Sequence, residues 1–151
     1  MELAYSTEVL NSILNALTIR VFWKDLDGVY LGCNQIFCDD DGHLSIEDVV
    51  GKNDYDLQAT KEQAEKYRRD DFEVITTGRP KFGIIEEFIG KNSLERRWLR
   101  TNKIPLIDEE GVICGVIGTY EEITPIIEAE SRNLSLHKEL LYKASHDYLT
   151  G

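Results

Sequence analysis

Cysteine and histidine side chains are the groups of this 151-residue chain best suited to nucleophilic or metal chemistry, and their spacing favours neither. Cys33, Cys38 and Cys114 are an odd number and contain no Cys-x-x-Cys pair, so neither a disulfide framework nor a zinc site is expected. We expect reduced, half-buried thiols. No spacing of serine, cysteine and histidine predicts a nucleophile–base pair. These residues give no indication of an enzyme.

An acidic segment offers the second candidate chemistry, because its spacing partly follows that of a calcium-binding EF-hand loop. Positions three, five, six, eight and twelve of such a loop would be Asp39, Asp41, Gly42, Leu44 and Asp48. Position one would be Phe37, which offers no ligand, and position twelve would be an aspartate in place of the bidentate glutamate. We therefore expect a solvated acidic turn and no metal site.

The charge balance limits the partners. Lys and Arg number 17 and Asp and Glu 28, which gives a net charge of −11. An acidic surface repels phosphate backbones and anionic lipids, so we expect no binding to nucleic acid or to membranes. The sequence contains no apolar run of about 20 residues. It also begins without a basic-then-apolar stretch, so we expect a cytoplasmic protein without a signal peptide.

Hydrophobic periodicity predicts the elements that position the polar groups. The expected order is helix, two strands, several helices, three strands and helix, over residues 2–17, 19–24 and 29–33, 34–51 and 61–77, 82–89, 96–105 and 112–121, and 125 onward. Residues 25–28 form a turn in which Gly28 takes a positive φ. The helix over 61–77 should bury Ala64, Tyr67, Phe72 and Ile75. Segregated helix and strand blocks favour an α+β domain with an antiparallel sheet.

Several short motifs, in this order, resemble those of a PAS domain over residues 18–124. They are Phe22–Gly28 with its Asp-x-x-Gly turn, Asn34-x-x-Phe37, Gly51–Leu57, Trp98–Leu99, Ile104–Leu106 and Gly115-x-x-Gly118. The family's closing Asp-Ile-Thr is here Glu122-Ile123-Thr124, which the resemblance assigns to coupling with the following linker. The resemblance implies a PAS fold: a five-stranded antiparallel sheet flanked by short helices, an N-terminal helix over 1–17 and a C-terminal signalling helix.

The end of the chain resembles a second family. Residues 144–151, Ala-Ser-His-Asp-Tyr-Leu-Thr-Gly, resemble the opening of a diguanylate cyclase (GGDEF) domain, the enzyme that makes cyclic di-GMP. The resemblance implies that 125–146 is a linker helix and that 147–151 begins a cyclase domain cut short here. Gly83–Phe88 echoes Gly-Gly-Glu-Glu-Phe but lacks the paired glycines, so no cyclase site is expected there.

Apolar spacing in the linker predicts self-association. A coiled-coil seam of about two heptads is formed by Ile126, Ala129, Asn133, Leu136 and Leu140. The alternative is a solvated tail. The leading helix carries a second apolar face, which we expect to cover the outer face of the sheet or to pair with its symmetry mate. Both features favour a homodimer.

The PAS resemblance also directs the search for a cofactor. A haem would need a histidine on the helix over 61–77, and a covalent flavin would need a cysteine shortly after Leu57. The sequence has neither, so neither cofactor is expected. Non-covalent flavin stays open, because Trp23 and Trp98 are able to stack on its ring. The cofactor is otherwise left unspecified.

A sheet curved over short helices encloses a cavity, and its expected lining defines the candidate ligand site. The candidate residues are Tyr55, Tyr67, Phe72, Ile75, Ile84, Glu86, Trp98, Arg100 and Tyr120. Inside the cavity, Arg100 would need Glu86 or a ligand as its partner. The alternative places Arg100 on the outer face.

The sequence thus predicts a non-catalytic PAS sensory and dimerisation module from a bacterial signalling protein. Its expected partners are a small molecule, a second copy, and its own C-terminal diguanylate cyclase domain. The alternative is a ligand-free dimerisation spacer between signalling domains. A cavity of about several hundred Å³ near Tyr67 and Trp98 would favour the sensor, and a filled core would favour the spacer.

Overall fold

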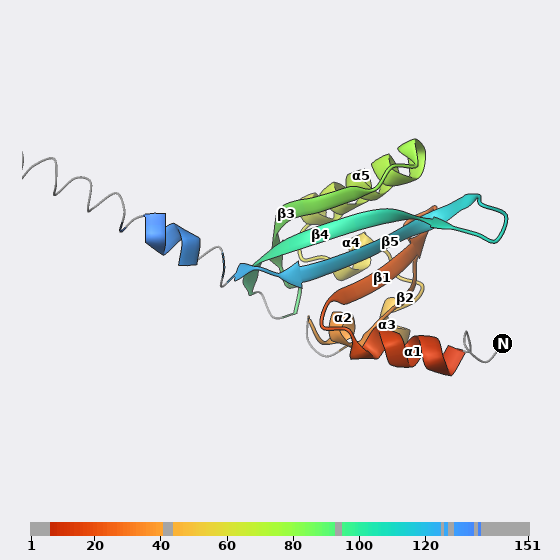
Figure 1. Ribbon diagram of the computed structural model, residues 1–151, viewed down its shortest axis with the longest axis horizontal. Coiled ribbons are helices and arrows are strands. Elements are labelled where there is room, and N and C mark those ends of the chain that lie inside the picture. The colour runs from red at the N-terminus through yellow and green to blue at the C-terminus, as the bar shows by residue number, and fades with distance from the viewer. Residues whose placement is uncertain are drawn as a thin grey trace, which may run out of the picture.

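The helices and strands follow one another in segregated blocks along the chain. The computed structural model describes residues 7–40, 44–92, 95–124, 126, 129–134 and 136. Its elements are α1 (Thr7–Ala16), β1 (Arg20–Asp25), β2 (Tyr30–Cys33), α2 (Gln35–Asp39), α3 (Ile46–Val49), α4 (Asp54–Leu57), α5 (Lys61–Thr77), β3 (Lys81–Ile89), β4 (Arg96–Ile107) and β5 (Ile113–Glu122). The strands form one antiparallel sheet in the order β2-β1-β5-β4-β3 (Figure 1). The predicted α+β class and five-stranded antiparallel sheet are confirmed.

Turn and cap residues set the limits of the elements. Between β1 and β2, the Asp25 carboxylate accepts a hydrogen bond from the Val29 N–H at 3.0 Å, and Gly28 has the expected positive φ of 82°. Helix α5 begins behind the capping side chain of Thr60 and ends at Gly78, whose φ is 68°. Such left-handed positions favour glycine, because a Cβ atom is strained there. Helix α5 has the bounds that the sequence predicts.

The buried stripe of α5 differs from the predicted one. Its buried residues are Ala64, Tyr67, Asp71 and Val74. Phe72 is instead 69% exposed, and Ile75 is only half-buried. Apolar residues alone identified the expected face, whereas the real face includes a carboxylate. Asp71 is buried because two lysines of the sheet pair with it.

The two faces of the sheet differ in what covers them. Helices α2 to α5 cover one face, which we call the cavity face, and leave the other, the outer face, open to the viewer of Figure 1. Side chains alternate between the faces along each strand. Phe22, Leu99 and Tyr120 lie on the cavity face and are buried. Their neighbours Trp23, Trp98 and Glu121 lie on the outer face.

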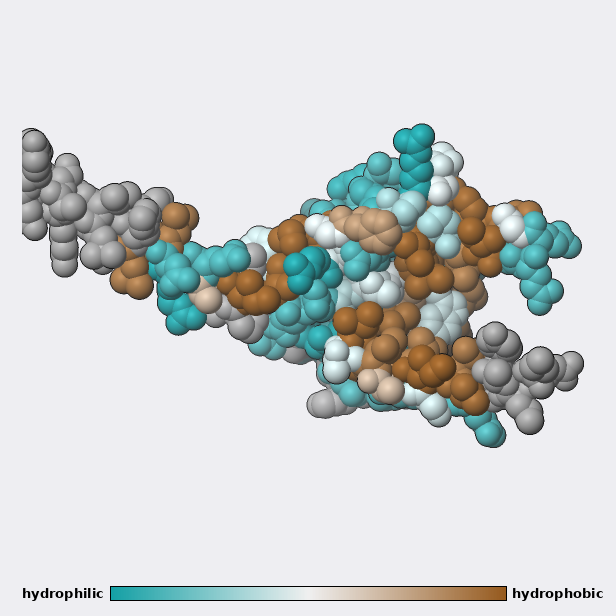
Figure 2. All heavy atoms as spheres, in the orientation of Figure 1, coloured by the Kyte–Doolittle hydropathy of each residue, from teal (hydrophilic) through white to brown (hydrophobic). Residues whose placement is uncertain are grey.

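Helix α1 stands apart from this core. Within its described bounds it has no buried residue, and its exposed apolar side chains include Val9, Leu10 and Ile13. Figure 2 shows a hydrophobic surface over α1, at the lower edge of the molecule. The Asn34 side chain attaches the helix by donating to the Leu14 carbonyl oxygen at 3.1 Å. In the single chain α1 leaves the outer face uncovered, which corrects the first of the two placements expected for it.

The chain continues beyond the sheet as a helix that points away from it (Figure 1). Ile126, Ala129, Asn133 and Leu136 of the predicted seam are exposed there. Leu140 and the cyclase-like residues 144–151 lie outside the described residues. Among the described helices, none has the length and apolar character needed to cross a membrane.

Candidate ligand-binding cavity

A cavity of about 60 Å³ lies between the cavity face of the sheet and the helices. Its walls are formed by Phe22, Lys24, Tyr30, Phe37, Asp40, Leu44, Leu57, Gln58, Tyr67, Glu86, Phe88, Leu99, Lys103 and Tyr120. This volume exceeds the roughly 10–15 Å³ that a cavity needs to hold one water molecule. The cavity adjoins Tyr67 as expected, but it is smaller than the several hundred Å³ that the sensor hypothesis anticipated.

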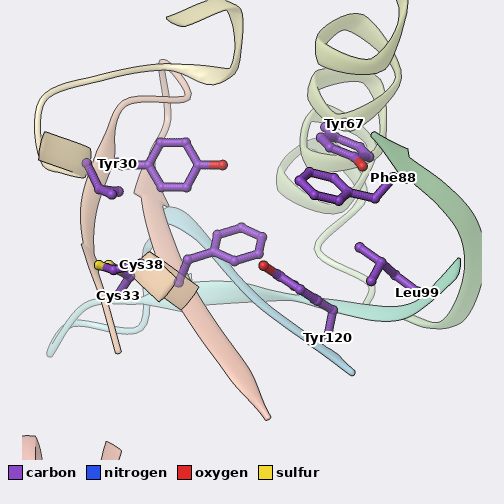
Figure 3. Close-up of a cluster of buried hydrophobic side chains, with 9 residues drawn as sticks. Tyr30, Cys33, Cys38, Tyr67, Phe88, Leu99 and Tyr120 are labelled. Carbon is purple, nitrogen blue, oxygen red and sulfur yellow. The ribbon is translucent and has the colours of Figure 1, made fainter. Parts of the chain in front are cut away.

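Aromatic rings form much of the wall. Phe22 packs against Tyr30, Phe37 and Tyr120, with ring centroids 5.6, 5.3 and 6.3 Å apart. Figure 3 shows the hydroxyls of Tyr30 and Tyr120 directed toward the middle of this cluster, with Tyr67, Phe88 and Leu99 opposite. Gly118 of β5 makes room for the Phe22 ring, because a Cβ atom there would lie 2.1 Å from its Cζ atom. The glycine therefore shapes the floor of the cavity.

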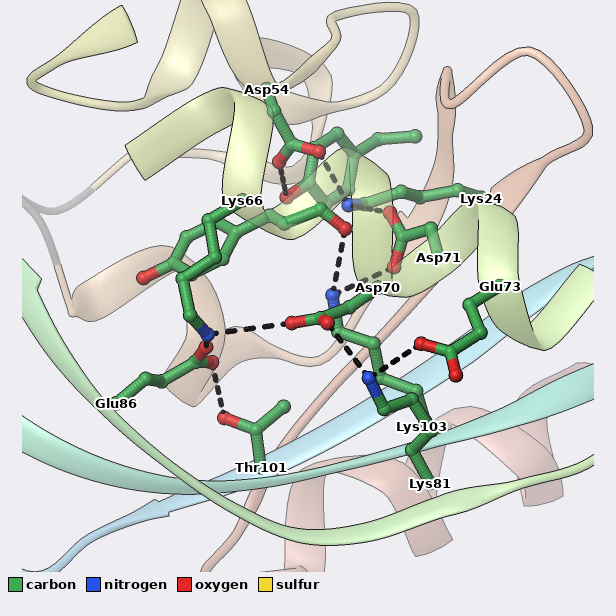
Figure 4. A network of polar contacts seen from close by, with 12 residues as sticks. Lys24, Asp54, Lys66, Asp70, Asp71, Glu73, Lys81, Glu86, Thr101 and Lys103 are labelled. Carbon is green, nitrogen blue, oxygen red and sulfur yellow. Dashed lines mark hydrogen bonds and ion pairs between the residues drawn. The ribbon is translucent and has the colours of Figure 1, made fainter. Parts of the chain in front are cut away.

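A buried ionic network joins the sheet to the helices (Figure 4). Lys24 Nζ donates to Asp54 and to Asp71, each at 2.7 Å. Lys103 Nζ donates to the second oxygen of Asp71, also at 2.7 Å, and Tyr30 donates its hydroxyl to Asp54 at 2.8 Å. All of these side chains are at least nine-tenths buried. Strands β1, β2 and β4 are thereby tied to α4 and α5.

The network shifts the pKa values of its members. Burial alone would raise the pKa of Asp71, but the positive charges of Lys24 and Lys103 outweigh it and lower that pKa. Burial alone would lower the pKa of Lys24, but Asp54 and Asp71 outweigh it and raise that pKa. Both groups are therefore held in their charged forms.

A further carboxylate in the wall, that of Glu86, is also paired. Glu86 accepts hydrogen bonds from Lys66 Nζ and from the Thr101 hydroxyl, each at 2.7 Å. Its position in the cavity wall agrees with its place among the predicted lining residues.

The Asp40 carboxylate, also in the cavity wall, pairs with three side chains of the sheet. It accepts from Arg20 at 2.8 Å, from Arg97 at 3.0 Å and from the Tyr120 hydroxyl at 2.6 Å. Burial and the Asp40 charge raise the pKa of Tyr120, so the hydroxyl remains protonated and donates. Asp40 thus connects α2 to three strands of the sheet.

The predicted coupling residues lie next to this cluster. Arg97 Nη1 is 3.8 Å from a Glu122 carboxylate oxygen. The Ile123 N–H donates to the Trp98 carbonyl oxygen at 2.8 Å, and the Trp98 N–H donates to the Thr124 hydroxyl at 2.7 Å. The segment from Glu122 to Thr124 is therefore attached to β4 where the sheet passes into the C-terminal helix.

Three of the nine predicted lining residues are in the cavity wall: Tyr67, Glu86 and Tyr120. The other six are not, and this corrects their expected positions. Tyr55 and Phe72 are exposed on the helices, and Ile75 lies beside Phe72 in a separate, smaller pocket. Ile84 is half-buried on β3, away from the wall.

Trp98 and Arg100 lie on the outer face of β4. Leu99 and Lys103, at odd-numbered positions of the strand, face the cavity, so the even-numbered Trp98 and Arg100 face outward. Arg100 Nε donates to Glu121 at 2.9 Å on the outer face, which is the alternative kept open for it. The open flavin hypothesis rested on Trp23 and Trp98, and both lie outside the cavity.

Sequence reasoning missed eleven wall residues: Phe22, Lys24, Tyr30, Phe37, Asp40, Leu44, Leu57, Gln58, Phe88, Leu99 and Lys103. Strand alternation from Phe22 and Tyr120 would have found part of this set. Lys24 and Lys103 carry no such signal, because only the fold brings their carboxylate partners to them.

Thiols and acidic groups form no second chemical site in the described part of the chain. Cys33 and Cys38 are buried with their sulfur atoms 3.3 Å apart, while Cys114 is half-buried elsewhere. Burial raises the pKa of the Cys33 thiol, so the thiol is held protonated. No group of three or more potential metal ligands occurs among these residues. Asp41 to His43 of the acidic segment lie outside them.

Comparison with known proteins points to one family. The chain matches the PAS fold family over residues 14–125, while no curated protein is detectably similar in sequence. The VqmA–ligand–DNA complex of Vibrio cholera is 23% identical, with a TM-score of 0.70 over 79% of this chain and 52% of that chain. The Vibrio cholerae VqmA dimer without target DNA is 24% identical, with a TM-score of 0.69 over 79% and 53%.

A PAS domain from Colwellia psychrerythraea is 16% identical, with a TM-score of 0.65 over 78% of this chain and 97% of that one. This chain therefore spans about half the length of the VqmA chains and nearly all of an isolated PAS domain. At these identities the likeness shows a shared fold.

Proposed function

Since the chain belongs to the PAS fold family, we propose that it is a sensory module that binds a small molecule reversibly in the cavity and passes that binding to an effector domain. The observation that carries the proposal is the cavity itself. A domain selected only as a rigid spacer gains stability by filling such a space, because the atoms that line an unfilled volume lose van der Waals contacts. Here aromatic walls and buried polar groups surround a space of about 60 Å³.

The contacts around Asp40 supply a route for the signal. Tyr120 lines the cavity and donates to Asp40, and Asp40 in turn pairs with Arg97 beside Glu122. A ligand that displaces Tyr120 would disturb these pairs and, through them, the segment that leads into the C-terminal helix. Switches of this kind bias an element between two arrangements.

We propose that the domain, over residues 18–124, acts through a linker helix over 125–146 on a diguanylate cyclase domain that begins at 147. The short resemblance at residues 144–151 supports this output. Such cyclases, by family resemblance, condense two nucleotides between two facing subunits. A sensor that sets the arrangement of the dimer would therefore control whether the two cyclase subunits face each other. We therefore propose a homodimer that uses α1 and the linker. VqmA, described as a dimer, supports the second copy.

The test compares ligand binding by the wild-type chain with binding by a variant whose cavity is filled. Leu99→Phe adds volume to the cavity wall, and Leu31→Phe is the matched control at a leucine that is 46% exposed. Small molecules released from the purified chain are identified by mass spectrometry, and a metabolite library is screened by thermal unfolding. We expect a compound that raises Tm by about 5 °C in the wild type and the Leu31→Phe variant, but not in the Leu99→Phe variant.

The ligand-free spacer predicts a different result. If no compound is released and none in the library raises Tm, the sensor proposal is rejected in favour of the spacer. A compound that stabilises all three proteins equally binds outside the cavity and rejects the proposed site.

A further inference from the structure

A surface of α5 outside its buried stripe combines arginines with exposed apolar side chains. Arg68 and Arg69 lie about one helical turn before Phe72, and Arg79 follows the end of the helix. Phe72 also lines the smaller pocket, which has a volume of about 30 Å³ and lies between α5 and the turn that joins β1 to β2. We call this region the arginine surface, and its residues are Leu26, Arg68, Arg69, Phe72, Ile75 and Arg79.

The fold holds the Arg68 guanidinium in place. Its Nη1 donates to the Asp27 carbonyl oxygen at 3.0 Å, and its central carbon lies 5.8 Å from the centroid of the Tyr55 ring. Gly28 makes room for it, because a Cβ atom there would overlap Arg68 Nη1. A guanidinium that is already positioned loses less conformational entropy when it pairs with a carboxylate of a partner.

The charges of the arginine surface are not neutralised within the described part of the chain. There, none of its three arginines has a carboxylate within ion-pair distance, and Arg68 donates only to a neutral carbonyl oxygen. Arg96 and Arg100 on the sheet are different, because each of them pairs with a glutamate. Asp27 adds one exposed negative charge beside the three positive ones, so the region is positive in a chain whose net charge is −11.

The composition of this region is that of a protein interface. Phe72 is 69% exposed and Leu26 is 55% exposed, and both line the smaller pocket. Aromatic residues and arginine are enriched at interfaces, where a few of them supply most of the binding free energy. Arginine pairs with carboxylates through two parallel hydrogen bonds. A segment that presents carboxylates beside an aliphatic side chain therefore complements both the charges and the pocket.

We propose that the arginine surface docks an acidic segment of another protein. Carboxylates of that segment pair with Arg68 and Arg69, and an aliphatic side chain between them enters the pocket beside Phe72. Elsewhere the negative charge of the chain repels such a segment, so its binding is restricted to this region. The proposal goes beyond the proposed function, since it involves neither the cavity nor α1 nor the linker.

The experiment uses three capped helical peptides of about 15 residues. The first is built from glutamate, alanine and leucine, with two leucines one turn apart and glutamates beside them. The second has glutamine in place of every glutamate, and the third has alanine in place of both leucines. NMR titration of the whole chain gives the dissociation constants and locates the contacts. We expect the first peptide to bind at least about tenfold more tightly than the second and about fivefold more tightly than the third, with shifts at Leu26, Gly28 and Phe72.

Matched variants separate this surface from general charge effects. Arg68→Gln and Phe72→Ala should each weaken binding of the first peptide about tenfold, because each removes a central contact. Arg69→Gln should weaken it less, and thermal unfolding should show that all three variants remain folded, since these side chains are outside the buried stripe of α5. Arg96→Gln is the control: it removes the same charge from a side chain on β4 that is 73% exposed, and it should change binding by less than about twofold.

Several outcomes would overturn the proposal. It is rejected if the first peptide does not bind, if its contacts lie outside the arginine surface, or if Arg96→Gln weakens binding as much as Arg68→Gln does. If the free chain self-associates in sedimentation and Arg68→Gln abolishes this, the occupant is a second copy. If a short single-stranded DNA binds the surface more tightly than the peptide and displaces it, the surface recognises phosphate instead. None of these results bears on the cavity, where the metabolite screen decides the proposed function.

Discussion

Asp71 illustrates how a charged residue takes a core position in this domain. It is 4% exposed and accepts hydrogen bonds from Lys24 and Lys103, each at 2.7 Å. Removal of one partner from a buried ion pair leaves the others uncompensated where water cannot reach them. The packing of α5 on the sheet therefore depends on this carboxylate.

Asp71→Asn should lower the free energy of unfolding by about 3 kcal/mol or more, because two buried lysines lose the charge that they share. Glu73→Gln is the matched control on the same helix: Glu73 also pairs with a lysine at 2.7 Å, but its side chain is 56% exposed. The control should change stability by less than about 1 kcal/mol. Urea unfolding measures both. Equal effects would show that burial of the network contributes little.

Acid should weaken the fold through the same carboxylates. Burial alone would raise the pKa of Asp70, but Lys81 and Lys66 lower it, and the pKa of Asp71 is lowered likewise. A folded carboxyl with a lowered pKa binds its proton at lower pH than in the unfolded chain. The unfolded chain therefore binds more protons below about pH 4, and the free energy of unfolding falls as pH drops through that window.

Urea unfolding at intervals from about pH 6 to about pH 3 measures this dependence. Asp70→Asn removes one of the groups, so its stability should fall less steeply than that of the wild type. A wild-type stability that stays constant down to pH ~3 would contradict the lowered pKa values.

At the scale of the elements, two glycines let aromatic rings lie flat on neighbouring strands. Gly118 of β5 makes room for Phe22 on the cavity face, and Gly32 of β2 makes room for Trp23 on the outer face. A Cβ atom at these glycines would lie 2.1 and 2.3 Å from the respective rings. The two sites are therefore sterically similar but belong to opposite faces of one sheet.

These two sterically similar glycines give a matched pair of variants. Gly118→Ala and Gly32→Ala should each lower the free energy of unfolding by about 1–3 kcal/mol, because a ring must shift to admit the methyl group. Only Gly118→Ala displaces Phe22 in the cavity wall, so only this variant should weaken the binding of a compound found in the metabolite screen. Urea unfolding measures the first effect, and the rise in Tm with that compound measures the second. Equal loss of binding in both variants would argue against the cavity as the binding site.

Among the residues that the structure describes, two apolar surfaces lie outside the PAS core. One is on α1, where Leu10 and Ile13 are 47% and 54% exposed. The other is on the C-terminal helix, where Ile126 and Leu136 are 53% and 58% exposed. About two heptads are marginal as an isolated coiled coil, so the linker needs the support of a second contact. A second copy that pairs with both surfaces would supply it.

Sedimentation should therefore find a dimer of the whole chain that dissociates when Leu10 and Ile13 are both replaced by aspartate. Thermal unfolding of the monomer should change little, because both side chains are exposed already. Phe82→Asp is the control: Phe82 is 70% exposed on β3, at the opposite edge of the sheet from β2. A fragment that ends at Thr124 should dimerise more weakly. Monomers in every case at high micromolar concentration would exclude both surfaces as dimer contacts.

The sequence by itself determined the five strands, the order of the helix and strand blocks and most of the helices, although it did not predict α4 (Asp54–Leu57). Local causes suffice for these: the alternation of strand residues, the cap of α5 at Thr60, and the turn at Gly28 with its positive φ. The PAS motifs, which occur in the family's order along the chain, additionally predict the five-stranded antiparallel sheet. Hence the five-stranded antiparallel sheet and the bounds of α5 agree with expectation.

The tertiary structure alone decided which side chains share the cavity. Which residues of β4 face the cavity cannot be predicted from a strand with large residues on both faces, so Trp98 was assigned to the wrong face and Arg100 was left open between the two. Apolar spacing did not include Asp71 in the buried face of the helix, and a carboxylate is costly to bury by itself. Its burial is favourable only where Lys24 of β1 and Lys103 of β4 meet it, and these three residues are brought together by strand pairing and helix packing.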